Sequence, residues 1–230
     1  MQHRIFIDAI QPTVTVSGDE FHHSIRVVRV REGEEVEVFD RAGKMARASV
    51  ASIANDHAVL NVGEEIASRE SPLALTLAMA IIQLEKFELV LQKATELGVQ
   101  AIIPLVTDRI ELRAERYAGK AERWQRIVFE AVKQSGRSIA PSIQSPAKFD
   151  DVIARDGTKI LFDADHPSAT QQPRNAATLF IGPEGGWSER ELQLARDHGA
   201  LFQRLGPRRL RAETAAIVGV AIITARFGDL

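Results

Sequence analysis

The sequence predicts an α/β protein in which a small β-rich unit precedes a mostly parallel sheet with helices on both faces. From residue 73 onward, apolar runs alternate with segments whose apolar residues recur at helical spacing, the pattern of a sheet buried on both faces. Residues 1–68 instead hold short β-branched or alternating runs, typical of strands. The 230 residues, 45% of them hydrophobic, are enough for one or two domains with real cores.

In the first 68 residues, five short runs predict strands. They are residues 4–8, 13–16, 35–39, 46–53 and 58–62. Residues 41–43 predict a hairpin turn, and Ser17 with Glu20 has capping-box spacing, which predicts a short helix. We expect these elements to form a compact barrel. The polar segment 63–72 ends in Ser-Pro and predicts a linker.

After residue 72, the sequence predicts alternating strands and helices. Strands are expected at 73–80, 99–106, 159–163, 178–181 and 200–205. Between them, helical spacing predicts one helix that ends at Gly98 and another that ends at Gly136. Ser188 and Glu191 have capping-box spacing at the start of a further helix, and a final helix begins near Glu213.

Two of these strands end in Gly-Pro turns that lead into helices, at 182–186 and at 206–207. Ligands of open α/β sheets bind beyond the carboxyl ends of strands, where glycine lets the backbone come close. The stretch 178–214 therefore predicts a ligand site, although Gly-Pro pairs also serve as ordinary turns. Neither loop is a P-loop or a Gly-x-Gly-x-x-Gly fingerprint, so the pattern predicts a ligand held by main-chain groups without naming it.

Composition excludes several classes of function. The chain has no cysteine, which excludes disulfides, thiolate zinc sites and a cysteine nucleophile, and its six histidines are scattered, so we expect no metal centre. The N-terminus lacks a signal-peptide core, and the most apolar segment, 215–225, is shorter than the roughly 20 residues that span a bilayer. We expect a soluble, cytoplasmic protein without membrane association. With a net charge of −2, any RNA binding has to use local basic patches.

Five ordered segments resemble one known family. They are HH with VVR at 22–29, FELVLQKATELGV at 87–99, PLVTDR at 104–109, EAVKQSGR at 130–137, and GPEGGWS at 182–188 followed by LGPRRLRAET at 205–214. Together they resemble the RsmE-type SPOUT methyltransferases, which methylate N3 of one uridine in 16S rRNA. Trp187 stands where the family more often has Phe, and Arg209 where it usually has an aliphatic residue.

The resemblance implies an S-adenosylmethionine (SAM) site in a trefoil knot, a PUA-like RNA-binding domain at 1–68 and a SPOUT methyltransferase domain at 73–230. It also implies a homodimer that acts on 16S rRNA, with both protomers contributing to the active site. The expected cofactor residues are Phe162, Ile181, Gly182, Pro183, Glu184, Gly185, Gly186, Leu205, Gly206, Leu210 and Thr214. The expected RNA-binding residues are His23, Arg26, Arg29 and Arg211. A solvated charged rim remains an alternative for the arginines near residue 29.

Uridine N3 is a weak acid, so an enzyme that methylates it must align N3 with the methyl carbon and favour the uridinate. A guanidinium stabilises charge on the uracil oxygens, which makes Arg109 and Arg137 the expected catalytic residues. Ordinary surface arginines are the alternative. Glu130 and Gln134 share a helix face, and their roles stay open, as does that of Glu213. The acceptor of the N3 proton stays open too.

Three other functions compete with this prediction. One is a non-catalytic RNA-binding or ribosome-assembly protein on the same fold, which the intact glycine loops disfavour. Another is a small-molecule enzyme with a nucleotide cofactor, which lacks a phosphate-binding fingerprint here. The third is a SPOUT methyltransferase for another RNA site.

Overall fold

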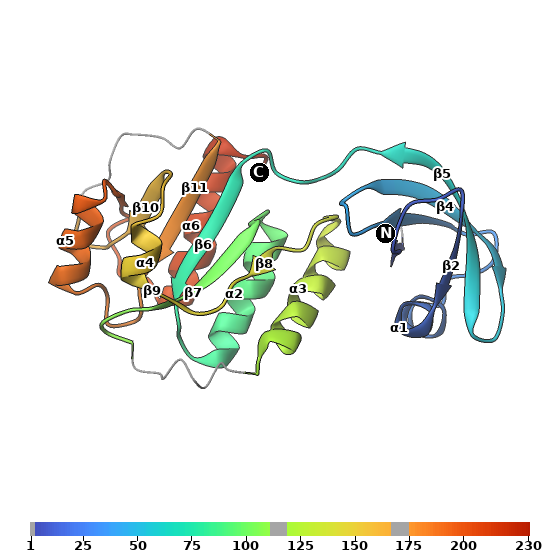
Figure 1. Cartoon of the computed structure of the whole chain (residues 1–230), viewed down its shortest axis with the longest axis horizontal. Helices are drawn as coiled ribbons and strands as arrows, with labels where there is room; N and C mark the ends of the chain where they lie inside the picture. Colours follow the sequence, from blue (N-terminus) through green and yellow to red (C-terminus); the bar gives the residue numbers. More distant parts are fainter. Residues whose placement is uncertain (1–2, 111–118, 167–174) are drawn as a thin grey trace. The chain divides into compact units, whose positions relative to one another are not determined.

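The computed structural model describes residues 3–110, 119–166 and 175–230. The chain divides into two compact units (Figure 1). The first contains the residues up to Glu70 together with Val132–Ile139, and the second contains Ser71–Ala131 and Ala140–Leu230. The sequence predicted one change of unit, between residues 68 and 73. The grouping of Val132–Ile139 with the first unit was not expected.

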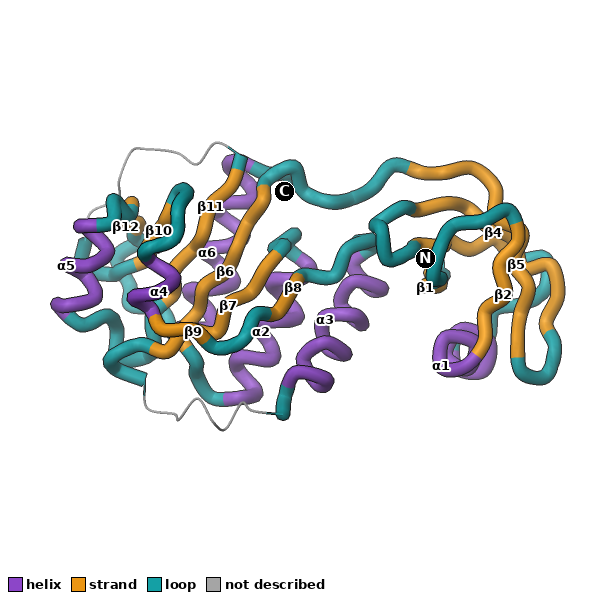
Figure 2. Tube along the Cα trace, viewed as in Figure 1, coloured by secondary structure: helices purple, strands orange, loops and turns teal. Residues whose placement is uncertain are grey.

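The first unit is built on a five-stranded sheet in the order β1-β3-β4-β5-β2. The strands are β1 (Arg4–Phe6), β2 (Thr13–Ser17), β3 (Glu35–Phe39), β4 (Met45–Ile53) and β5 (His57–Ile66). β1 pairs with β3 in parallel, and the other pairs are antiparallel. Two irregularities in the β4–β5 pairing increase the local twist, and Figure 2 shows the sheet curled. Val36, Val38 and Leu60 are completely buried in its core.

Two local predictions in this unit are wrong. β5 runs to Ile66, paired with β4, so the first part of the predicted linker is a strand. Ser17 precedes the short helix α1 (Gly18–Phe21) without capping it through its side chain. Glu20 is engaged elsewhere, because its carboxylate accepts hydrogen bonds from Phe6 N at 3.1 Å and from Lys133 Nζ at 2.8 Å. Tertiary partners have thus replaced the local capping box.

The second unit contains a seven-stranded sheet whose main path runs β12-β10-β11-β6-β7-β8, with β9 paired to β7. All of its pairs are parallel, as predicted. The strands are β6 (Ala74–Ala80), β7 (Ala101–Val106), β8 (Ser142–Ile143), β9 (Ala147–Lys148), β10 (Lys159–Phe162), β11 (Ala176–Ile181) and β12 (Leu201–Gln203). The sequence did not predict β8 and β9, which are two residues each and too short to show a periodicity.

Helices cover both faces of this sheet. They are α2 (Leu84–Glu96), α3 (Ala121–Ser135), α4 (Phe149–Ile153), α5 (Glu189–Asp197) and α6 (Ala212–Phe227). Leu77 belongs to a core cluster with residues of α2, α3 and α6, whereas its neighbour Ala78 belongs to a cluster with α4 and α5. Adjacent residues of one central strand therefore serve opposite layers, which explains the unbroken apolar run of β6.

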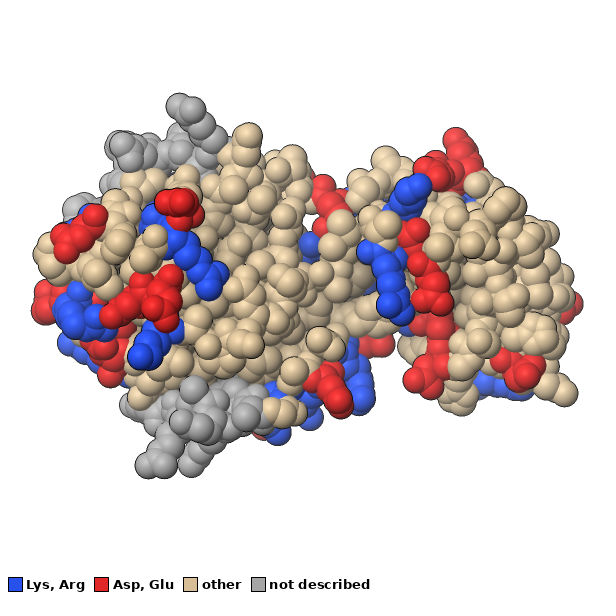
Figure 3. Space-filling model, viewed as in Figure 1, with Lys and Arg blue, Asp and Glu red and all other residues tan. Residues whose placement is uncertain are grey.

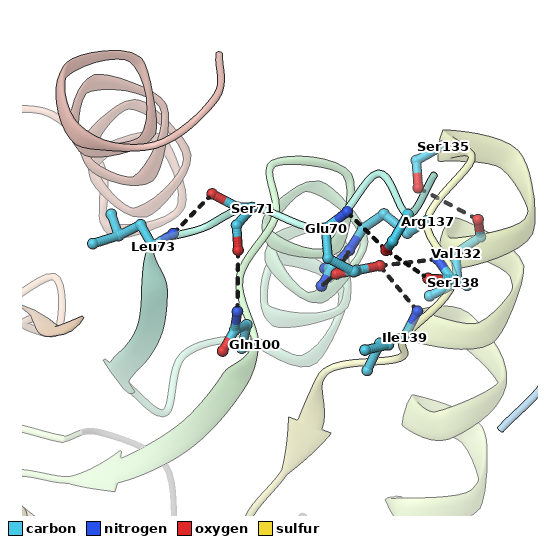
Figure 4. A network of polar contacts seen from close by, with 10 residues as sticks. Glu70, Ser71, Leu73, Gln100, Val132, Ser135, Arg137, Ser138 and Ile139 are labelled. Atoms are coloured by element: carbon cyan, nitrogen blue, oxygen red, sulfur yellow. Dashed lines mark hydrogen bonds and ion pairs between the residues drawn. The ribbon is translucent and has the colours of Figure 1, made fainter. Parts of the chain in front are cut away.

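A buried ion pair joins the ends of the first unit's two segments (Figure 4). Arg137 Nη2 and Nε donate to Glu70 Oε2 at 2.6 and 3.1 Å, and Glu70 Oε1 accepts from two backbone amides, those of Ser138 and Ile139. Burial works to raise the pKa of Glu70, but the hydrogen bonds from Arg137 and the amides outweigh it and hold the pKa below the usual value. Glu70 is therefore ionised at neutral pH.

We expect Arg137→Ala to lower the free energy of unfolding at pH 7 by about 3 kcal/mol, because it leaves a mostly buried carboxylate without its cation. A carboxylate whose pKa is lower in the folded state stabilises the fold above its unfolded pKa, and this contribution is lost as pH falls through the folded pKa. The stability of the variant should therefore fall less than that of the parent below about pH 4. Urea unfolding of parent and variant at pH 7 and below pH 4 measures these free energies. Arg41→Ala, which removes an exposed pair with Asp8, is the control, and an equal effect there would contradict the prediction.

Candidate functional site

The second unit contains a pocket of about 260 Å³ at the carboxyl ends of β10, β11 and β12. Three loops line it, those after β10 (162–166), after β11 (181–187) and after β12 (203–210). They meet because β10 pairs in parallel with both β11 and β12, so that the three strands lie side by side and end at one edge of the sheet (Figure 2). Arg109, Ala212 and Ala215 also contribute to the wall.

The structure brings nearly all of the predicted cofactor residues into this wall. Phe162, Ile181, Gly182, Pro183, Glu184, Gly185, Gly186, Leu205, Gly206 and Leu210 line the pocket. Thr214 does not line it and is exposed in the first turn of α6. The cofactor-binding role of Thr214 stays a prediction.

The Trp187 side chain packs against the glycine loop (182–186). Its indole Nε1 donates to Phe162 O at 3.0 Å, and its ring packs on Phe149 with 5.0 Å between ring centroids. A Cβ on Gly182 would lie 3.0 Å from the Trp187 ring, tighter than nearly all such contacts, so the indole would have to shift. Packing against Trp187 therefore favours glycine at 182. Relative to Phe, Trp187 adds a hydrogen bond between the glycine loop and the end of β10.

Gly186 and Gly185 have different surroundings. Gly186 has φ +70° and donates to Pro183 O at 2.9 Å, which makes a tight turn. Gly185 lies against the loop after β7, where an added Cβ would be 3.4 Å from Arg109 Cβ. Arg109 Nη1 donates to Gly185 O at 3.0 Å, so the predicted catalytic arginine contacts the glycine loop directly.

Lys86, in the first turn of α2, is a part of the site that sequence reasoning missed. Its Nζ donates to Glu184 Oε1 at 2.6 Å and lies 4.0 Å from Glu213 Oε1. The hydrogen bond from Lys86 and its charge lower the pKa of Glu184, which keeps this pocket carboxylate ionised. No sequence spacing could have revealed the pair, because 98 residues separate its members.

Asp163 and His166 form a second missed group, on the loop after β10. Asp163 Oδ1 lies 2.9 Å from Asp165 N and 2.7 Å from His166 Nδ1. Arg196 Nη2 lies 2.7 Å from His166 Nε2, and because arginine can only donate, Nε2 accepts and Nδ1 carries the proton. His166 thus orients the Asp163 carboxylate in the pocket wall. The position of Asp163 at a strand end was the signal available in the sequence.

Of the predicted RNA-binding residues of the first unit, His23 and Arg26 lie in the π-helix His22–Val27 and Arg29 follows it. Arg26 is exposed and donates to Asn55 O at 3.3 Å, and His23 is half-buried. Arg29 is exposed with φ +66°, a left-handed conformation that favours glycine. The RNA-binding role of Arg29 stays a prediction. On the face of the molecule shown in Figure 3, acidic side chains lie beside basic ones.

The remaining predicted residues do not join the pocket wall. Arg211 is the exposed N-cap residue of α6, in the second unit. Arg137 is only 3% exposed, and its guanidinium is engaged by Glu70, so its catalytic role stays a prediction. Within the described ranges, no group of His, Asp and Glu side chains is arranged to hold a metal ion. No described helix is long and apolar enough to cross a membrane.

Comparison with known proteins defines the class. The family model for an RNA methyltransferase domain matches residues 69–224, and that for an RNA methyltransferase PUA domain matches 16–63. The chain is thus an RNA methyltransferase.

Relatives identify the particular family. The ribosomal RNA small subunit methyltransferase E of Synechocystis is 35% identical over 229 residues, covering 94% of this chain and 74% of that relative. The Bacillus subtilis enzyme of the same name is 30% identical, covering 93% and 90%. A crystal structure of the Neisseria gonorrhoeae enzyme, bound to SAM, has a TM-score of 0.90 at 30% identity over the whole of both chains. This chain belongs to the ribosomal RNA small subunit methyltransferase E family, as the sequence motifs indicated.

We expect Gly182→Ala to lower the free energy of unfolding by about 2 kcal/mol, because its methyl group displaces the Trp187 indole. Denaturant unfolding measures this. Gly63→Ala is the matched control, since its added Cβ would lie 3.6 Å from the nearest atom, an ordinary contact. Equal stability of the two variants would show that Trp187 does not constrain position 182.

Proposed function

We propose that this chain transfers the methyl group of SAM to N3 of a uridine in 16S rRNA. The observation that carries the proposal is the pocket, in which three loops bring ten of the predicted cofactor residues together. Two further findings support it: the Neisseria gonorrhoeae relative was crystallised with SAM, and so was a Legionella pneumophila methyltransferase that is 34% identical to this chain.

The residues of the wall fit such a cofactor. Gly185 and Gly186 leave backbone groups accessible to polar atoms, while Ile181, Leu205 and Leu210 provide apolar surface for a base. Bound SAM would supply a methyl group on a positively charged sulfonium. The ionised Glu184 and the oriented Asp163 complement that charge.

Arg109 is the group that we propose acts on the substrate. Methylation requires N3 to lose its proton, and the resulting charge spreads onto the uracil oxygens. A guanidinium at the pocket wall stabilises that charge without delivering or accepting a proton. Arg137 would first have to leave Glu70 to act in the same way, so we assign it a structural role and keep its catalytic role as a secondary proposal.

Several properties are proposed from the family resemblance. They are the trefoil knot in the second unit, a homodimer in which both protomers contribute to the active site, and a cytoplasmic location. RNA binding by the first unit, at about residues 1–68, is supported by the match to a PUA domain and by the exposed arginines Arg26 and Arg29.

Mass mapping of modified nucleotides in rRNA tests the proposal, using cells with and without the protein. We expect one N3-methyluridine to disappear from 16S rRNA. Loss of a different modification would point to another RNA site, and an unchanged rRNA together with intact RNA binding would favour a non-catalytic protein. Calorimetry with SAM and with NAD distinguishes these from a small-molecule enzyme with another cofactor.

We expect Gly185→Val to abolish measurable SAM binding while the fold survives, because a β-branched side chain there pushes the Arg109 loop away. Titration calorimetry with SAM measures the affinity, and circular dichroism checks the fold. Gly63→Val, in β5, is the control and should bind SAM like the parent. Unchanged affinity in Gly185→Val would remove this loop from the proposed site.

We expect Arg29→Gly to weaken RNA binding while raising the free energy of unfolding by up to about 1 kcal/mol, since glycine relieves the left-handed backbone. The slope of log K against log salt should become shallower by about 0.7 to 0.9, because one phosphate contact is lost. Arg29→Lys keeps both the charge and the strain, so its RNA affinity should stay near that of the parent. Salt-dependent RNA titrations decide, and equal affinities for all three proteins would exclude a phosphate contact.

A further inference from the structure

The capping box at the start of α5 also makes hydrogen bonds to a residue outside its own helix. Glu191 is completely buried, and its Oε2 accepts from Ser188 N at 2.9 Å, as in an ordinary capping box. Its second oxygen, Oε1, accepts instead from Asp108 N, also at 2.9 Å. Ser188 Oγ is likewise used twice: it accepts from Glu191 N at 3.1 Å and donates to Asp108 Oδ2 at 2.6 Å.

Asp108 lies in the loop after β7, directly before Arg109. Its carboxylate also accepts from Arg190, with Nη2 at 2.7 Å from Oδ1 and Nε at 3.0 Å from Oδ2. Arg190 Nη1 in turn donates to Asp150 of α4 at 2.8 Å. Hydrogen bonds from Arg190 and Ser188 lower the pKa of Asp108, so the carboxylate is ionised at neutral pH.

These contacts tie the Arg109 loop to the segment that follows the glycine loop. Arg109 itself is exposed, and among the described residues its guanidinium bonds a single carbonyl, that of Gly185. A long exposed side chain is not held in one place by one hydrogen bond, because it loses considerable rotamer freedom when it is ordered. Its backbone is held instead by Asp108, whose amide and carboxylate are both bonded to the start of α5.

We propose that Asp108 is a positioning residue, which through Ser188, Arg190 and Glu191 holds Arg109 at the glycine loop in the geometry that methyl transfer requires. The inference rests on the proposed function for the role of Arg109. A helix cap by itself needs neither the second carboxylate oxygen of Glu191 nor the second hydrogen bond of Ser188, and both go to Asp108.

Asp108→Ala separates positioning from capping, because it leaves both reciprocal bonds between Ser188 and Glu191 in place. We expect the single-turnover rate of methyl transfer, at saturating RNA and SAM, to fall by about 10- to 100-fold, since small misplacements of a catalytic group have effects of that size. The dissociation constant for SAM should change less than about threefold, because the lost interaction matters mainly in the transition state.

Two further variants sharpen the test. Asp108→Asn keeps an oxygen that can accept from Arg190, so its rate should lie between those of the parent and Asp108→Ala. Asp150→Ala releases the other end of Arg190 while leaving every bond of Asp108 intact, so its rate should match that of the parent. A parent-like rate in Asp108→Ala, or an equal loss in Asp150→Ala, would overturn the positioning role.

Amide hydrogen exchange gives a readout that does not depend on methyl transfer. In Asp108→Ala, peptides covering 182–191 should exchange faster than in the parent and in Asp150→Ala. Unchanged exchange would refute the link between the two loops. If the parent itself does not methylate rRNA, the proposed function fails, and the exchange data still decide whether Asp108 holds the glycine loop.

Discussion

The parallel pairing of β10 with both β11 and β12 is the constraint on which the site depends. Phe162 is in register with Ile181 on one side and with Gln203 on the other. Three segments, separated by up to about forty residues of chain, therefore leave the sheet at the same edge, and each continues into a loop that lines the pocket. Without that pairing, the glycine-containing loops at 182–186 and 206 would not meet in one pocket.

The glycine loop is held from several directions within the second unit. Trp187 ties it to the end of β10, Lys86 holds Glu184, and Arg109 bonds the carbonyl of Gly185. A site with backbone groups in fixed positions loses little entropy when it binds a ligand. The glycines let the neighbouring segments come close, and the polar side chains around them supply the rigidity that glycine lacks.

The two Ser-x-x-Glu segments show how context decides a local signal. At Ser188 and Glu191 the capping box forms, and the buried Glu191 carboxylate accepts hydrogen bonds from both Ser188 N and Asp108 N. At Ser17 and Glu20 the same spacing forms no capping box. The Glu20 carboxylate instead accepts hydrogen bonds from the backbone amide of Phe6 in β1 and from Lys133 in α3. Partners distant in sequence therefore compete with the local hydrogen bonds that spacing predicts.

The sequence by itself determined most strands and helices, the parallel sheet and the two glycine turns at its edge, because apolar periodicity and turn chemistry are local properties of the chain. The family followed from the resemblance of its ordered motifs. Only the tertiary structure decided which side chains meet. In the folded chain, Arg137 is buried in an ion pair with Glu70, and Thr214 lies outside the pocket wall. Lys86 bonds Glu184, 98 residues away in the sequence. Such contacts depend on how strands pair and how helices are rotated about their axes. The spacing of residues along the sequence does not predict these tertiary contacts.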